Sequence, residues 1–122
     1  MKMISLRYFK PEEFARCVPS CKMEECDEQA LLMLDELRDR LGMPIILNSA
    51  FRSKQYEKKK GRTGQSSHCK GLAFDVRCFD TKYRAELVRC AFEVGFTRIG
   101  IGKSFVHIDC DSQKSFPCIW LY

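Results

Sequence analysis

The sequence predicts an α+β fold, with helices packed on one face of a small, mostly antiparallel sheet. Two long segments repeat apolar residues at helical spacing, and five short segments have the composition or alternation of strands. Helical segments come first and most strand segments follow, an order typical of α+β proteins. The 122 residues, 45% apolar and 30% charged, fit a single globular domain over residues 1–122.

The first helical segments lie in the N-terminal third of the chain. The stretch FKPEEFAR predicts a short helix that begins at Pro11, because proline suits a first helical turn. The stretch DEQALLMLDELRDRLG predicts the clearest helix, which Asp27 can cap and Gly42 can end. Four leucines at helical spacing predict its buried face: Leu31, Leu34, Leu37 and Leu41.

Strand and helix patterns then alternate. PIILNSAF predicts a strand that begins at Pro44, and the polar, lysine-rich segment 52–65 predicts a long loop with about one helical turn. LAFDVRC predicts a second strand. TKYRAELVRCAFEVG predicts a second long helix, which Asp80 or Thr81 can cap and Gly95 can end.

The C-terminal part of the chain predicts three further strands. RIGIG and FVHIDC form a hairpin joined through Lys103 and Ser104, and CIWLY is the last strand. Antiparallel pairing follows for the hairpin, because so short a connection can only reverse the chain.

The eight cysteines allow two interpretations. Their even number is compatible with disulfides, but the missing secretory signal favours reduced thiols. Cys78 and Cys110 fall on the expected buried faces of strands, where free cysteine behaves as a small apolar residue, and Cys90 falls on a helix. Three cysteines cluster closely in CVPSCKMEEC: Cys17, Cys21 and Cys26.

Charge and hydropathy limit the classes of partner. The net charge is +5, and the block Lys58–Arg62 is either a solvated loop or a site of attraction for an anionic polymer such as nucleic acid or a bacterial cell wall. No apolar run approaches the roughly 18 residues of a membrane span. The start, MKMISLRYFKPEEF, is not a secretory signal peptide, so we expect synthesis in the cytoplasm.

The chain has only two histidines, and both lie near an aspartate in or before a strand. Side chains alternate across a strand, so LAFDVRC and FVHIDC each have one apolar face for the helices and place Asp75 and His107 on the opposite, open face. The preceding loop can fold His68 over the same face. Two imidazoles and one carboxylate are a common catalytic zinc set, with water in the fourth position. Purely structural hydrogen bonding of the histidines is the alternative.

The same residues carry a resemblance. SSHCKGLAFDV, from Ser66 to Val76, has the pattern S-x-H-x-x-G-x-A-x-D, and FVHID supplies a second histidine element. Together they resemble the zinc peptidases that include D-alanyl-D-alanine carboxypeptidases and phage L-alanyl-D-glutamate endolysins, a group that shares its fold with the Hedgehog signalling domain. NSAFRS and YFKPEEFARC resemble further elements of the short, phage- and bacterium-associated members, so the likeness covers nearly the whole chain.

The resemblance implies a role for each motif residue. His68, Asp75 and His107 are the expected ligands of one zinc ion. Arg52 is expected to bind the substrate's carboxylate or to polarise the scissile carbonyl, which suits the fixed donor fork of a guanidinium. Ser66 is expected to hydrogen-bond within the site or to the substrate.

The chain departs from the family at one position. Many members have an acidic general base three residues before the last histidine, where this chain has Ser104. Asp109 is the expected substitute, because it shares a strand face with His107; alternatively it orients a metal ligand from behind. Asp111 is a weaker candidate for the base.

The resemblance therefore implies a zinc-dependent peptidase, either carboxypeptidase or endopeptidase, that uses metal-activated water on peptidoglycan stem peptides or cross-links. We expect a monomer that reaches the cell wall after release or delivery. One alternative is a catalytically inactive zinc-containing binding module of the same fold. A nucleic-acid-binding protein built on the cysteine cluster is a weaker alternative, because the cluster lacks a fourth ligand at zinc-finger spacing.

Overall fold

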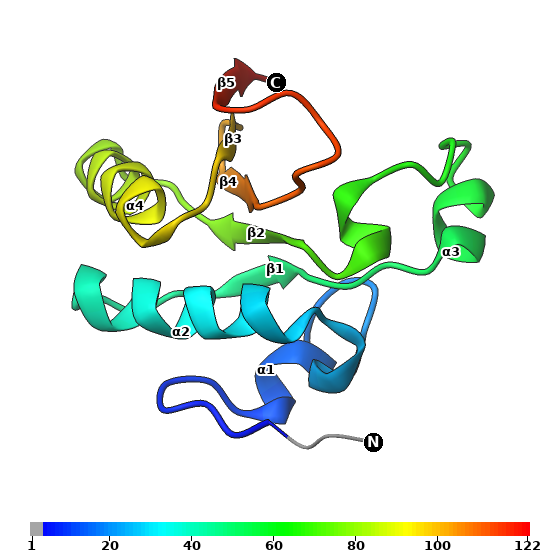
Figure 1. Ribbon diagram of the computed structural model, residues 1–122, viewed down its shortest axis with the longest axis horizontal. Helices are drawn as coiled ribbons and strands as arrows, with labels where there is room; N and C mark the ends of the chain where they lie inside the picture. The colour runs from blue at the N-terminus through cyan, green and yellow to red at the C-terminus, as the bar shows by residue number, and fades with distance from the viewer. Residues whose placement is uncertain (1–3) are drawn as a thin grey trace.

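A five-stranded sheet organises the protein, whose computed structural model describes residues 4–122 (Figure 1). Its strands lie in the order β1-β2-β4-β3-β5. All neighbours are antiparallel except β3 and β5, so the predicted α+β class with a mostly antiparallel sheet is confirmed. The strands are β1 (Leu47–Ser49), β2 (Ala73–Arg77), β3 (Arg98–Ile101), β4 (Phe105–Asp109) and β5 (Cys118–Leu121).

Two fourteen-residue helices, α2 (Glu28–Leu41) and α4 (Thr81–Val94), begin and end where the sequence predicts. Asp27 and Asp80 cap them by accepting hydrogen bonds from backbone N–H groups one turn ahead. Glycines in the left-handed conformation end both helices. Neither these helices nor any other helix within residues 4–122 is long and apolar enough to cross a membrane.

The apolar face of the sheet packs against the helices. α2 packs on α4, and α4 packs on β4. Five side chains from the three central strands are fully buried there: Phe74, Val76, Ile99, Val106 and Ile108. Burying side chains of this size contributes about 1.5–3 kcal/mol each, so this face determines which way every residue of β2 and β4 points.

Four short helices connect these elements: α1 (Pro11–Ala15), η1 (Met23–Glu25), α3 (Lys54–Lys59) and η2 (Ser67–Lys70). Pro11 begins α1 as predicted. The segment predicted as a long loop with about one helical turn contains α3, which Ser53 caps by accepting from the backbone N–H of Tyr56. The two 3₁₀ helices, η1 and η2, were not predicted, because such short helices lack a periodic apolar pattern.

Two predictions need correction, on the start of the first strand and on the burial of Cys110, and the structure adds the orientation of the last strand. The first strand begins at Leu47 and not at Pro44, and its short pairing with β2 contains a register shift between Leu47 and Ser49. The last strand joins the sheet parallel to β3. Cys78 is buried as predicted, but Cys110 is only half-buried, because it lies just beyond the end of β4.

The cysteines are free thiols and most lie in the core. The predicted cluster of Cys17, Cys21 and Cys26 is buried among apolar side chains of the N-terminal segment. Cys90 on α4 is also buried. These residues therefore pack as small apolar groups in this structure.

Gly71 joins η2 to β2 and allows the N-terminal segment to approach closely. Its φ is 72°, in the left-handed region, and a Cβ there would lie 2.7 Å from the backbone nitrogen of Asp27. That nitrogen donates a hydrogen bond to the Gly71 carbonyl at 2.9 Å. A side chain at this position would therefore separate the start of α2 from the start of β2.

We predict that Gly71→Ala destabilises the protein by about 3 kcal/mol or more, because backbone strain and a backbone clash add. Gly61→Ala is the matched control: its φ is also positive, at 79°, but nothing lies within 4 Å of the added Cβ. The control should cost only about 1–2 kcal/mol. Urea unfolding measures both, and equal losses would contradict the clash.

Candidate metal centre

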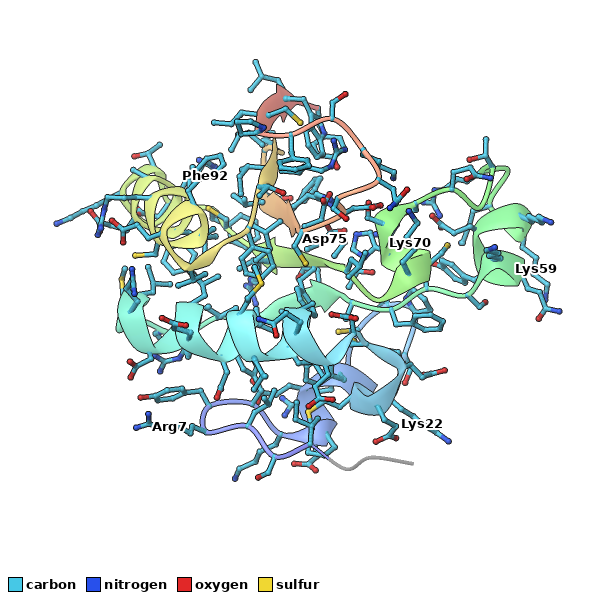
Figure 2. The ribbon with its side chains drawn as sticks, in the orientation of Figure 1. Arg7, Lys22, Lys59, Lys70, Asp75 and Phe92 are labelled. Atoms are coloured by element: carbon cyan, nitrogen blue, oxygen red, sulfur yellow. The ribbon has the colours of Figure 1, made fainter. Side chains whose placement is uncertain are left out.

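The sheet register brings the two predicted strands together at the expected residues. β2 and β4 are antiparallel neighbours, and Asp75 stands directly opposite His107. Nδ1 of His107 lies 3.1 Å from Oδ1 of Asp75, and Nε2 of His68 lies 3.2 Å from the same oxygen. Figure 2 shows Asp75 near the centre of the view, on β2. One carboxylate oxygen thus meets both imidazoles.

η2 positions His68. Ser66 caps this short helix, since its Oγ accepts from the backbone N–H of His68 at 3.2 Å. Nδ1 of the ring lies 2.6 Å from the carbonyl oxygen of Ala50. Because a carbonyl only accepts, Nδ1 carries a proton, and Nε2 is the ring nitrogen that faces Asp75. The resemblance had left Ser66 either a structural or a substrate-binding role, and its observed hydrogen bond is structural.

Asp109 lies behind His107. Its Oδ2 is 2.7 Å from Nε2 of His107, on the opposite edge of the ring from the nitrogen that faces Asp75. The carboxylate is fully buried: Oδ2 also accepts from Arg98 Nε at 3.3 Å, and Oδ1 lies 3.0 Å from the same nitrogen and accepts from the backbone N–H of Asp111 at 3.1 Å. With every oxygen engaged by a protein donor, this geometry favours orientation of His107 over the proton-accepting role that we expected.

The weaker candidate for the general base, Asp111, and Ser104, which stands at the family's usual acid position, both lie elsewhere. Asp111 is fully buried and accepts from Ser67 at 2.8 Å and from Lys70 at 3.0 Å, so it ties η2 to the end of β4. Ser104 lies in the β3–β4 turn, where its carbonyl accepts from the backbone N–H of Cys78. Both residues are therefore part of the frame around the centre.

The face that the sequence predicts to be open is covered at His107, whose exposure is only 7%. The Trp120 ring of β5 lies 5.3 Å from the His107 ring, and Arg98 lies over Trp120 at 5.0 Å. Gly100 makes this approach possible, because a Cβ there would lie 2.7 Å from the indole. Sequence reasoning missed Trp120 and Arg98, since nothing local predicts that β5 returns beside β3.

Arg52 lies at the edge of the centre and is held at three points. It donates to Asp75 Oδ2 at 2.8 Å and to Ser49 Oγ at 2.9 Å, and its Nη1 lies 3.6 Å from Glu57. Glu57 is 1% exposed and also pairs with Arg62 at 2.6 Å. Sequence reasoning missed Glu57, because a glutamate on a lysine-rich helix has no local signal of burial.

The electrostatics of the centre favour a charged pair when no cation is present. Burial opposes charge on Asp75, but hydrogen bonds from His107 and His68 outweigh it and hold the pKa of the carboxyl well below its ordinary value. Burial likewise opposes protonation of His107, yet hydrogen bonds to Asp109 and Asp75 raise its pKa. A metal cation bound at this place would take the position of the histidine protons that hydrogen-bond to Asp75.

The donor set fits a zinc ion. One ligand atom from each of His68, Asp75 and His107 lies within 4.8 Å of the other two, and no other such group of three occurs among residues 4–122. Two nitrogens and one oxygen leave a fourth tetrahedral position free, as catalytic zinc sites require. The second nitrogens of both histidines are already bonded to Ala50 and Asp109, which is the usual support for metal-ligating imidazoles. The cysteine cluster makes no comparable group.

Comparison with models of protein families identifies a relationship. A family model described as Peptidase M15 matches residues 7–111, which include all three residues of the candidate centre, Arg52, Asp109 and Asp111. No curated protein matches the chain. The matched range ends before β5, so Trp120 lies outside it.

We predict that His68→Ala lowers bound zinc from one ion per chain to nearly none, because three protein ligands become two. Metal analysis after dialysis measures this. Cys21→Ala is the control for zinc held by the cysteine cluster, and it should retain one ion. Full occupancy in a His68→Ala, His107→Ala double variant would refute the assignment.

Asp109→Asn tests the position of this carboxylate behind His107. We predict zinc binding weaker by about 10–100-fold, measured by competition with a chromogenic chelator, because the charged acceptor that orients the ring is lost. Ser104→Ala should change nothing. Unchanged zinc affinity, combined with an activity loss of about 10²–10⁴-fold, would instead identify Asp109 as the general base.

Proposed function

The chain belongs to the peptidase M15 family, a family of zinc-dependent peptidases, and from this we propose that it hydrolyses peptide bonds of peptidoglycan stem peptides or cross-links with one zinc ion. The observation that carries the proposal is the convergence of His68, Asp75 and His107 across the β2–β4 register. The peptidoglycan substrate rests on the motifs SSHCKGLAFDV and FVHID and on the basic charge of the chain.

Zinc would be held by Nε2 of His68, the carboxylate of Asp75 and Nδ1 of His107. When bound, zinc supplies Lewis-acid chemistry, which polarises a carbonyl and lowers the pKa of water to about 7. The chain's own contribution is a donor set that is preorganised before the metal arrives. Ala50 and Asp109 each hold one imidazole by its far nitrogen, so the tautomers and ring planes need no rearrangement.

Arg52 is the proposed electrophilic and substrate-binding residue. Its guanidinium touches Asp75, so it lies beside the place where a scissile carbonyl would approach. A fixed cation there stabilises negative charge that develops on the carbonyl oxygen, which is commonly the largest catalytic contribution. Ser49 and Glu57 hold two other nitrogens of the same group, so Arg52 is already oriented in the free protein.

A catalytically inactive zinc-containing binding module remains the second candidate. The observation that favours it is the environment of the acidic residues: Asp109 and Asp111 are fully buried and bonded to donors, and Ser104 replaces the usual acid. Such a module would bind wall peptides without cleaving them. Product analysis separates the two candidates.

We predict that the zinc-loaded protein releases new fragments from purified peptidoglycan and that a chelator abolishes this release. Mass analysis of the products identifies the bond: release of single D-alanine indicates a carboxypeptidase, and shorter stem peptides or opened cross-links indicate an endopeptidase. Arg52→Ala should lower kcat/KM by about 10²-fold or more while zinc remains bound. Retained binding to peptidoglycan without any cleavage would favour the inactive module.

A further inference from the structure

A groove of about 670 Å³ leads away from the candidate metal centre. It is lined by residues of α1, β1 and β2, and Asp75 and Arg52 of the candidate centre are among them. α1 lies beside β1, on the side of β1 away from β2 (Figure 1). The groove is thus a continuous surface along which a peptide bound at the centre can extend.

Two arginines line the groove without a carboxylate partner. Among residues 4–122, neither Arg16 nor Arg77 forms an ion pair: Arg16 Nε lies 3.4 Å from the backbone carbonyl of Glu12, and the Arg77 guanidinium lies over the Phe79 ring at 5.1 Å. Both are exposed. Five other arginines do pair with carboxylates: Arg40, Arg52, Arg62, Arg89 and Arg98. The groove therefore keeps two arginine forks available for an anion.

The acidic residues of the groove do not neutralise these arginines. Glu13 accepts from the backbone N–H of Lys10 at 2.8 Å, and Asp75 is engaged by Arg52 and both histidines. Glu12 also lines the groove, but no ion pair joins its carboxylate to either arginine. The basic side chains can therefore meet a ligand without first breaking an ion pair.

The register determines how far an anion would lie from the reacting bond. Arg77 follows Asp75 by two residues and shares its face of β2, so about 7 Å of strand separates them. Phe105 stands opposite Arg77 in the same ladder that sets His107 opposite Asp75. An extended peptide with its scissile carbonyl at the centre would bring a group about two residues away to Arg77.

The opposite wall of the groove is held in place and carries apolar side chains. The backbone N–H of Val18 donates to the carbonyl of Asn48 at 2.9 Å, which joins the segment after α1, and with it Arg16, to β1. Val18 and Ile46 line the groove and are 73% and 52% exposed. Exposed apolar groups that line one groove together with two cations suit a peptide with short aliphatic side chains and a carboxylate.

We propose that this groove binds an acidic segment of the peptide substrate and that Arg77 and Arg16 select a carboxylate about two residues from the scissile bond. The inference rests on the proposed function for the position of the scissile bond. It adds a substrate requirement: a carboxylate distant from the reacting centre, recognised by residues outside the metal site. A matching peptide with an amide at that position binds less well.

The test uses the zinc-loaded protein and two synthetic pentapeptides that differ only in one internal group, a carboxylate or its amide. Calorimetry measures Kd and a product assay measures KM and kcat. For the acidic peptide, Arg77→Gln should raise Kd and KM about tenfold, and the Arg16→Gln, Arg77→Gln double variant should raise them further. For the amide peptide, both variants should match the unmodified protein. Arg89→Gln, on the surface of α4 and outside the groove, is the control and should change neither peptide's binding.

The outcomes separate this inference from the proposed function. Equal Kd values for the two peptides, or equal losses for both in Arg77→Gln, would overturn the groove assignment even if both peptides are cleaved. Preferential, Arg77-dependent binding of the acidic peptide would support the groove even if neither peptide is cleaved, in which case the proposed hydrolysis fails. Circular dichroism confirms that each variant is folded.

Discussion

The pairing of Asp75 with His107 across β2 and β4 is the constraint on which the rest of the structure depends. It places one carboxylate between two imidazoles and within 2.8 Å of Arg52. A shift of one residue in this pairing would turn Asp75 toward the helices and bring Phe74 and Val76 to the other face. Those two apolar side chains are fully buried against the helical layer. Core packing therefore fixes the strand register, and the register fixes the positions of Asp75 and His107.

Three buried carboxylates support the centre from outside it. Asp109 holds His107, Glu57 holds Arg52, and Asp111 holds η2 through Ser67. Burying a carboxylate is costly unless donors surround it, and replacing a whole buried ion pair by well-packed apolar residues is often neutral or stabilising. Their common feature is that each fixes a side chain or helix of the candidate centre, so we interpret them as positioning residues rather than as contributors to stability.

The two sides of the sheet's polar face differ in accessibility. β5 covers His107 with Trp120 on one side, whereas the groove along β1 leads outward from Asp75 on the other. The proposed path of a ligand is therefore from the β1 side, where Arg52 and the unpaired arginines lie. The candidate metal centre, the proposed role of Arg52 and the proposed carboxylate subsite all lie along that path.

The sequence by itself determined the two capped helices, the alternation of β2 and β4 and the identity of the three candidate ligands, because these depend on local spacing and on a compact motif. It could not place β5 beside β3 or bury Glu57 and Asp109. Those facts depend on contacts between residues far apart in the chain, such as Trp120 with His107 and Glu57 with Arg52. The role of Asp109 shows the difference most clearly. Alternation put it on the same strand face as His107, but only the tertiary structure decided that it lies behind the ring, because Arg98 and the backbone of Asp111 hold its carboxylate there.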